Sequence, residues 1–443
     1  MAQQQAQPLG SRFVRLWAAS TTSALGSGLA TIAAPLLVAA RSSSPVVVAA
    51  TFGVSWLPWL LFALPGGVLV DRTDRRRLMV VIDWTRMAAV GILATAIALG
   101  QTSIVVLDCV LFAINTGEVV FRSAGQAMIS SVTPRAQLER ANGWLTGGTT
   151  LMQNMIAGPL GGFLFVVAAC VPFFVNAATY AVSAILIGLV AGTYRASPRT
   201  PATSPGRRHA RVTGSTGRQR TRSTWADVAE GFRWLMHQRV LRTMTFLIGM
   251  LNLTLTAGIA VLVLLAKQRL HLGSVGYGTL FTCEAAGGLA GSLIGDRLIK
   301  KVTATWTIRI GLLIEAGLYL TLATSRSAYV VGFMLFAFGM HGALWTIVGS
   351  SLRQRLAPPE MIGRVASTSM FIAAGGNCAG AMLGGVIATK FGLTAPYWVA
   401  FGAAVCVSAT TWRIFNRVAI AQAYAEPAPH QDLPQEPTRS PSA

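Results

Sequence analysis

The sequence is poor in charged residues, and in acidic residues above all. Asp, Glu, Lys and Arg make up 12% of its 443 residues, and only 15 of them are acidic. Soluble domains carry about 25% charged residues. Together with a hydrophobic content of 53%, this shortage excludes an ordinary soluble domain and indicates a protein that crosses a membrane many times.

The residue patterns of enzymes and metal sites are missing as well. There is no phosphate-binding loop, which excludes ATP as the energy source, and no Ser-His-Asp or Cys-His arrangement. The five cysteines lie in apolar stretches without paired spacing, which is typical of small core residues. They are Cys109, Cys170, Cys283, Cys378 and Cys406. We therefore expect no enzyme, no metal ion and no cofactor.

Long apolar runs are what the sequence does contain. Each run has about the 20 residues that a helix needs to span a bilayer, so we expect an all-α membrane protein with twelve transmembrane helices. The runs cover residues 12–40, 44–70, 78–99, 104–127, 141–166, 169–194, 241–266, 276–295, 304–324, 328–350, 365–389 and 395–415.

The net charge of +21 has a distribution that argues against a nucleic-acid partner. If the N-terminus is cytoplasmic, 31 of the 36 lysines and arginines fall on the cytoplasmic side or within helices. The external turns hold only Arg41, Lys267, Arg269, Arg326 and Lys390. This positive-inside pattern predicts cytoplasmic termini in a plasma membrane, with anionic lipids as partners of the basic loops.

Two sequence features repeat at nearly one offset. Asp71 and Asp296 both close an apolar run with neighbouring basic residues, and Pro134 to Arg140 is echoed by Pro358 to Arg364. Such repeats are typical of transporters, so we expect two pseudo-symmetric six-helix bundles. The expected division is 1–194 for the first bundle, 195–240 for a basic linker with an amphipathic helix, 241–417 for the second bundle and 418–443 for a disordered tail.

The turn Gly67-x-Leu69-x-Asp71-Arg72-x-x-Arg75-Arg76 resembles the signature turn of the major facilitator superfamily, although Asp74 stands where the family usually has glycine. Further patterns resemble its drug-exporter branch, which includes macrolide efflux pumps and the enterobactin exporter. There are four such patterns. The first combines residues 13–17, 23–26 and 34–35, the second is Asp83-x-x-Arg86, the third combines residues 117–119 and 138–143, and the fourth is residues 229–235. The resemblance implies the twelve-helix fold and transport of a small molecule.

Within this resemblance, the charged turns imply a gate. Gly67 would allow two helices to approach closely, and Asp71 would face the start of the eleventh helix near Arg364, where backbone amides carry partial positive charge. The alternative is that the arginines only set the topology. The residues with an expected gating role are Gly67, Asp71, Arg72, Arg75, Arg76, Asp83, Arg86, Asp296, Arg297 and Arg364. Arg72 and Arg75 could pair with Asp83 or Glu139, and Asp83 with Arg86 at i, i+3.

Acids inside a membrane are functional candidates by default. Glu118 and Arg122 are four residues apart and could pair, so Glu118 is either a proton carrier or part of a fixed ion pair. Glu284 has no charged residue within a helical turn and is the second candidate carrier. Glu315 is expected to pair with Arg309 or water.

Polar residues near the middle of the runs are candidates for lining a central cavity, or else for interhelical hydrogen bonds. They are Asn115, Asn154, Asn252, His341, Trp345 and Asn377. The stretch 158–162, Gly-Pro-Leu-Gly-Gly, resembles the antiporter motif of drug exporters and predicts bending or close packing of the fifth helix.

We therefore predict a monomeric secondary transporter that exports small amphipathic molecules by alternating access, with protons as the counter-ion. Uptake or uncoupled facilitation is the alternative transport mode. A non-transporting membrane sensor or scaffold is the alternative of another class.

Overall fold

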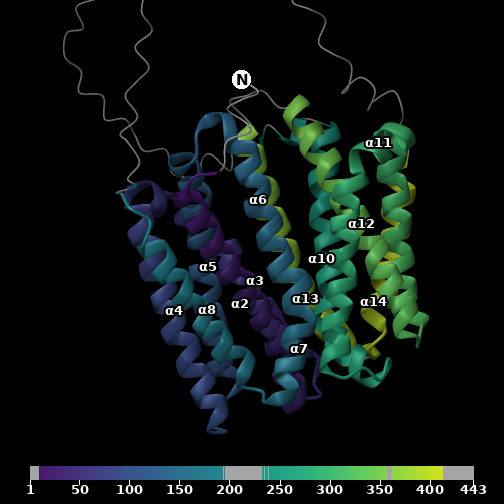
Figure 1. Ribbon diagram of the computed structural model, residues 1–443. Helices are drawn as coiled ribbons and strands as arrows, with labels where there is room; N and C mark the ends of the chain where they lie inside the picture. The colour runs from purple at the N-terminus through teal and green to yellow at the C-terminus, as the bar shows by residue number, and fades with distance from the viewer. Residues whose placement is uncertain are drawn as a thin grey trace, which may run out of the picture.

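The structure is a computed structural model that describes residues 9–192, 194, 232–233, 235–237, 239–356 and 362–412. In these residues all regular structure is helical. The elements are α2 (Ser11–Arg41), α3 (Pro45–Arg72), α4 (Arg75–Ala98), α5 (Ile104–Val132), η1 (Arg135–Gln137), α6 (Leu138–Thr150), η2 (Leu151–Ile156), α7 (Ala157–Val167), α8 (Val171–Gly188), α10 (Arg239–Gln268), α11 (Ser274–Thr324), α12 (Ala328–Leu356), α13 (Ile362–Phe391) and α14 (Ala395–Thr411) (Figure 1). The linker 195–222, most of the expected amphipathic helix at 224–239 and the tail beyond 417 lie outside the described residues.

The twelve predicted crossings all correspond to helices. Ten described segments are long and apolar enough to span a membrane, and the other two crossings are the first part of α11 and the 17-residue α14. The predicted crossings 276–295 and 304–324 join into α11, which kinks at Thr303 (φ 72°, ψ 152°). A β-branched residue rarely adopts a positive φ, so this turn is strained.

The fifth crossing is irregular. It begins as α6, changes to a π-helix in η2 and continues as α7. The sequence predicted bending at the Gly-Pro stretch 158–162, but the distortion lies one turn earlier. Pro159 has no N–H and cannot bond the carbonyl of Met155 four residues before it. The helix therefore departs from α geometry on the N-terminal side of the proline.

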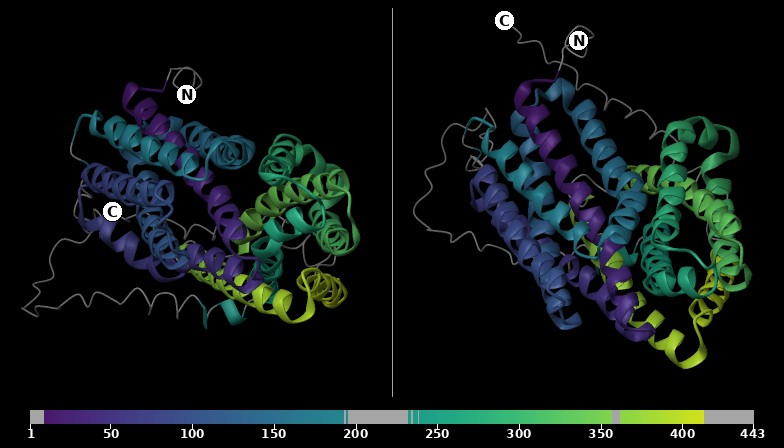
Figure 2. Two further views of the ribbon diagram at one scale, coloured as in Figure 1. Left: turned by 90° about the horizontal axis from the view of Figure 1, so that it is seen from below. Right: turned by 60° about the horizontal axis from the view of Figure 1, so that its bottom comes forward.

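The helices form two adjacent groups, α2–α8 and α10–α14 (Figures 1 and 2). They meet where α3 packs on α13 and where α7 packs on α11. Both contacts use glycine. A Cβ on Gly162 would lie 2.7 Å from the Ser274 carbonyl carbon, and one on Gly385 would lie 3.1 Å from the Pro45 carbonyl oxygen. Small residues allow helices to approach this closely in a membrane.

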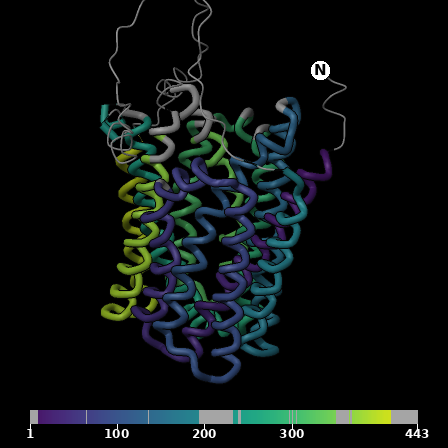
Figure 3. The backbone as a smooth tube through the Cα atoms, turned by 90° about the vertical axis from the view of Figure 1, so that its left-hand side faces the viewer, coloured from purple at the N-terminus to yellow at the C-terminus, as the bar shows by residue number. Residues whose placement is uncertain are grey.

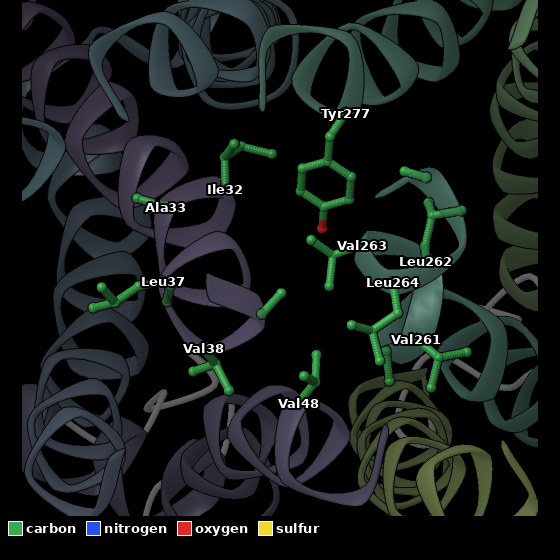
Figure 4. Packing of buried hydrophobic residues seen from close by; sticks show 14 of the residues in the cluster. Ile32, Ala33, Leu37, Val38, Val48, Val261, Leu262, Val263, Leu264 and Tyr277 are labelled. Atoms are coloured by element: carbon green, nitrogen blue, oxygen red, sulfur yellow. The ribbon is translucent and has the colours of Figure 1, made fainter. Parts of the chain in front are cut away.

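The two ends of the helix bundle are packed differently. We call the end where α2 starts at Ser11 the N-terminal face, and the end where α2 stops at Arg41 the opposite face; the helices run between these faces in Figure 3. Near the opposite face one apolar cluster includes residues of both groups, shown in Figure 4. It contains Leu37 and Val38 of α2, Val48 of α3, 261–265 of α10 and Tyr277 of α11.

Near the N-terminal face, in contrast, the described residues form separate clusters. One is built from α2, α3, α4, α5, α6 and α8 and includes Leu16, Met79 and Met128. The other is built from α10, α11 and α12 and includes Met244 and Leu312. In the described part of the chain, apolar clusters thus join the two groups at the opposite face and stay within one group each at the N-terminal face.

Candidate transport site

The residues predicted to form a gate lie at the N-terminal face, but the expected contact is not described. Asp71, Arg72 and Arg297 are exposed. The side chains of Asp296 and Arg364 lie outside the part of the chain whose side chains are described. A Cβ on Gly67 would meet no described atom within 4 Å. The close helix approach at Gly67 and the gating role of Asp71 both stay predictions.

Among the described residues, neither Arg72 nor Arg75 forms an ion pair with Asp83 or Glu139. The Arg75 guanidinium donates to the Ala127 carbonyl of α5 at 3.0 Å and lies 3.3 Å from the Ser131 hydroxyl. Arg76 donates to the carbonyls of Ile187 and Gly188 at the end of α8. Cations stabilise the partly negative C-terminal ends of helices, so both arginines hold the first group of helices together at this face.

Asp74 has a structural role at the position where the family usually has glycine. It caps α4 by accepting the Arg77 N–H at 3.0 Å, and its second oxygen accepts the Tyr194 N–H at 3.0 Å. Burial acts to raise the pKa of this carboxyl, but the hydrogen bonds from Arg77 and Tyr194 and the positive charge of Arg77 prevail, and its pKa is lowered. Asp74 thus ties the start of α4 to the chain that follows α8.

A network of four charged side chains lies inside the first group of helices. The predicted pair Asp83–Arg86 forms at 3.3 Å, and the predicted pair Glu118–Arg122 forms at 2.5 Å. Arg86 also forms an ion pair with Glu118, which joins the two pairs. The side chains of Asp83 and Arg86 are 0% and 2% exposed. Two acids and two arginines therefore balance in charge.

The Arg86–Glu118 link was not predicted, although a depth argument could have found it. Arg86 is 11 residues from the start of α4 and Glu118 is 14 residues from the end of α5. At 1.5 Å per residue both lie roughly 16–21 Å below the same face. A Cβ on Gly117 would lie 2.8 Å from Arg86 Cδ, so this glycine gives the arginine its space.

Three hydroxyl groups complete the network, and sequence reasoning missed their roles. Arg86 donates to the Tyr180 hydroxyl at 2.7 Å, to Ser27 at 3.1 Å and to Ser23 at 3.4 Å. Ser27 also donates to the Glu118 carboxylate at 3.0 Å. The Arg86 guanidinium lies 3.9 Å from the centre of the Tyr180 ring. α2, α4, α5 and α8 are thus joined through one guanidinium group.

Arg122 connects this network to the irregular fifth crossing. It donates to the Gln153 side chain of η2 at 2.5 Å, and its guanidinium lies 5.7 Å from the centre of the Trp59 ring. The Arg122 side chain is 43% exposed, compared with 9% for Glu118. Arg122 is therefore the one member of the four that reaches an open space.

The second group of helices contains a cavity of about 290 Å³. Its lining runs along α10 from Leu241, in the first turn, to Leu255, roughly 21 Å deeper at helical rise. The cavity therefore extends from near the N-terminal face to the middle of the helices. It is lined by Leu241, Met244, Thr245, Ile248, Leu251, Asn252, Leu255, Glu315, Phe338, His341, Gly342, Trp345, Thr346, Gly349 and Ser369.

Three of the six residues predicted to line a central cavity lie along this cavity of the second group. Asn252, His341 and Trp345 line it. Asn115 instead donates to the Leu111 carbonyl of its own helix, and Asn377 accepts a hydrogen bond from Thr256 at 2.7 Å, between α13 and α10.

Asn154 also does not line this cavity; it lies exposed on η2. For Asn377 the alternative of an interhelical hydrogen bond is correct. Position along the chain sets the depth of each asparagine, but not the direction in which it points.

Glu315 lines the cavity, and its expected partner Arg309 is elsewhere. Arg309 donates to the Trp412 carbonyl at 2.8 Å and lies 4.5 Å from the centre of the Trp412 ring. Glu315 accepts the Tyr319 hydroxyl at 2.7 Å, and that hydroxyl lies 3.1 Å from Thr254 Oγ1. In the described structure no cation approaches the Glu315 carboxylate.

Glu284 lies in the first part of α11 and is partly buried. No ion pair or hydrogen bond of its side chain is found among the described residues. It does not line the cavity. Its backbone belongs to a close crossing with α12, where a Cβ on Gly339 would lie 2.7 Å from the Glu284 carbonyl carbon. The prediction that Glu284 has no charged partner agrees with this geometry.

One hydrogen bond crosses between the two groups beside these acids. Thr282 of α11 donates to the Met155 carbonyl of η2 at 3.1 Å. This is the carbonyl that Pro159 leaves without its usual helical donor. The nearby backbones are close, since a Cβ on Gly158 would lie 2.9 Å from Thr282 Oγ1. The irregular turn therefore provides a bonding point between the two groups.

The comparisons with known proteins agree with this architecture. A family model described as a transmembrane secretion effector matches residues 5–439. The chain belongs to this family of the major facilitator superfamily. The multidrug efflux pump Tap of Mycobacterium tuberculosis is 26% identical over 423 residues, covering 91% of this chain and 93% of Tap. The macrolide efflux protein A of Streptococcus pyogenes is 26% identical over 133 residues, covering 30% of this chain and 33% of that protein.

Solved structures of other transporters share the fold of this protein. The nucleoside transporter NupG has a TM-score of 0.66 at 10% identity, covering 91% of this chain and 99% of NupG. A bacterial homologue of the iron transporter ferroportin in an inward-facing state has a TM-score of 0.68 at 15% identity, covering 93% of this chain and all of the other. The predicted family, the twelve-helix fold and the absence of enzymatic function are confirmed. The protein is a multi-pass membrane transporter for a small-molecule substrate.

Proposed function

We propose that this protein exports small amphipathic molecules from the cytoplasm across the plasma membrane by alternating access. The observation that carries the proposal is the unequal packing of the two ends. An apolar cluster shared by both groups closes the opposite face, and the cavity reaches toward the N-terminal face. A transporter in this state takes up substrate at the N-terminal face and releases it after the groups rock against each other.

The charge distribution supports the orientation of the protein in the membrane. The lysines and arginines concentrated at the N-terminal face favour its position in the cytoplasm, together with both chain termini. The same residues are suited to contact anionic lipids. We propose the residue divisions 1–194, 195–240, 241–417 and 418–443 as the domains of a monomer. The Tap and macrolide efflux relatives support export of drug-like molecules.

Proton antiport is the coupling that the buried charges favour. The network around Glu118 is balanced by Arg86 and Arg122, so its carboxylate is stabilised as an anion. Glu284 and Glu315 have no such cation among the described residues. A buried carboxylate without a partner is costly, and a proton removes that cost. We therefore place proton exchange at Glu284 and Glu315, and assign the Glu118 network to holding the helices.

Dye efflux from cells tests the proposal. We would compare the wild type with Glu118→Gln, Glu284→Gln and Glu315→Gln, each with and without a protonophore. We expect wild-type efflux to stop with the protonophore and to be lost in at least one of the two variants of α11.

Efflux that persists without a proton gradient would indicate uncoupled facilitation, and dye accumulation above the control level would indicate uptake. Either result contradicts proton-driven export. A protein that moves no dye and no metabolite in either direction would instead support a sensor or scaffold.

A further inference from the structure

The cavity in the second group of helices has one aromatic wall. Phe338, His341 and Trp345 lie along one face of α12 and pack edge to face, with ring centres 6.5 Å and 6.1 Å apart. All three line the cavity. Aromatic rings offer a flat apolar surface, and their faces attract cations. At about 290 Å³, the cavity is near the lower end of the range for small-molecule sites, about 300 Å³.

Glu315 is the one acid among the residues that line this cavity. Its Oε1 accepts the Tyr319 hydroxyl at 2.7 Å, which orients the carboxyl group. Within the described residues its second oxygen has no hydrogen-bonding partner. A negative charge held in place in an apolar cavity is a recognition element for a positive group.

Among the side chains that the structure describes, no cation is placed to neutralise Glu315. The residues of α10, α12 and α13 that line the cavity include no lysine or arginine. On α11 itself, Arg309 is bound to Trp412. The part of α14 that packs beside Tyr319 contributes Ala400 and Ala404. Of the described lining residues, His341 is the only titratable one besides Glu315, and its ring packs against the rings of Phe338 and Trp345.

The amide and hydroxyl groups that line the cavity have hydrogen-bonding partners within the protein. The Asn252 amide donates to the Ile248 carbonyl at 2.7 Å, and the Thr245 and Ser369 hydroxyls lie 3.2 Å from each other. These groups are not reserved for a particular substrate. Recognition in the cavity therefore depends on one negative charge and on apolar area, which suits a class of molecules and not one compound.

We propose that the cavity binds amphipathic organic cations, with the cationic group at the Glu315 carboxylate and the apolar body against Phe338, His341 and Trp345. This inference rests on the proposed export function and names the substrate class of that site. A bound cation and a bound proton both neutralise Glu315, so each excludes the other. When the carboxyl is protonated, binding of one cation releases one proton to water.

Calorimetric titration of the purified full-length protein in detergent tests the binding step without any gradient. The probes are three permanent cations of different size, benzyltrimethylammonium, ethidium and tetraphenylphosphonium, with uncharged Nile red for comparison. We expect at least one cation to bind, with an affinity that rises with pH and with release of up to one proton per cation. Failure of all three cations to bind would overturn the inference, as would cation affinity that does not change with pH.

Variants separate the charge from the fold. Glu315→Gln keeps an acceptor for Tyr319 and should lose at least tenfold in cation affinity together with the pH dependence, while Nile red binding is kept. Glu315→Asp should restore part of the cation affinity. Asp108→Asn, which changes an acid of α5 outside the cavity, should bind cations like the wild type. Unchanged cation affinity in a folded Glu315→Gln protein would overturn the inference.

The two proposals can fail separately. If the wild type exports Nile red with a proton gradient but binds cations independently of Glu315, the export function stands and the substrate class is wrong. If cations bind through Glu315 but no probe is exported, the recognition site stands and the export function is wrong.

Discussion

At the scale of single residues, charge balance distinguishes the two groups of helices. In the first group, Arg86 contacts both Asp83 and Glu118, and Arg122 completes the set. In the second group, the Tyr319 hydroxyl is the one hydrogen-bond partner of the Glu315 carboxylate among the described residues. Paired buried charges hold a structure together, whereas an unpaired buried acid is available for exchange.

Replacing Arg86 should destabilise the protein strongly. Arg86→Met leaves the buried Asp83 without a cation and Glu118 with Arg122 alone, and removing one partner of a buried ion pair costs roughly 3–5 kcal/mol. Thermal unfolding of the purified protein measures the loss. Arg122→Met is the matched control, because Arg122 is 43% exposed, and exposed pairs contribute about 0–1 kcal/mol. Equal melting temperatures for the two variants would contradict the central position of Arg86.

The Asp74 carboxyl group should make the stability of the protein depend on pH. Burial acts to raise its pKa, but the hydrogen bonds from Arg77 and Tyr194 and the charge of Arg77 lower the pKa of the folded state below the ordinary value of an aspartic acid. The carboxylate therefore stabilises the fold above that ordinary pKa, and this contribution is lost as the pH falls through the lowered pKa. We expect Asp74→Asn to melt below the wild type at pH 7. The difference should shrink when both are measured below about pH 3.8. A difference that is constant with pH would show that the charge of Asp74 is not involved.

At the scale of elements, close contacts between helices connect the two groups. α7 and α11 touch through glycine backbones, and Thr282 bonds the carbonyl that Pro159 leaves free. Gly162 of α7 and Ser274 of α11 lie near the opposite face, so this contact has to pivot or slide when the apolar packing at that face opens.

Filling the α7–α11 contact should impair transport. A Cβ on Gly162 would lie 2.8 Å from Val275 Cα, and overpacking of this kind costs about 1–3 kcal/mol. We expect Gly162→Ala to reduce dye efflux several-fold at equal expression. Gly147→Ala in α6 of the same crossing is the control, because a Cβ there meets no described atom within 4 Å. Equal efflux by both variants would mean that the contact can accommodate the added methyl group without loss of transport.

At the scale of the whole molecule, the structure is closed at one face and divided at the other. The predicted gate at Asp71 belongs to the divided face, where Asp71 is exposed. An exposed acid is expected of a latch that forms only when this face closes, by contact with the start of α13.

Neutralising Asp71 tests whether this face closes during function. We expect Asp71→Asn to reduce efflux at least tenfold. Cation binding to the purified protein should persist, because Asp71 does not line the cavity. Glu139→Gln, an exposed acid of the same face, should transport normally. Efflux by Asp71→Asn at the wild-type rate would show that Asp71 does not act as a gate.

The order of residues along the chain was enough to predict the helices and the local pairs. Span length and charge asymmetry depend on composition within a window, and the pairs Asp83–Arg86 and Glu118–Arg122 depend on helical spacing. The link between Arg86 and Glu118, the cavity position of Glu315 and the closed face depend on how separate helices are rotated and packed. Membrane helices that are apolar all round carry little periodicity to reveal that rotation. Asn115 and Asn252 are both mid-helix asparagines, yet only the packing of their neighbours turns Asn252 toward the cavity.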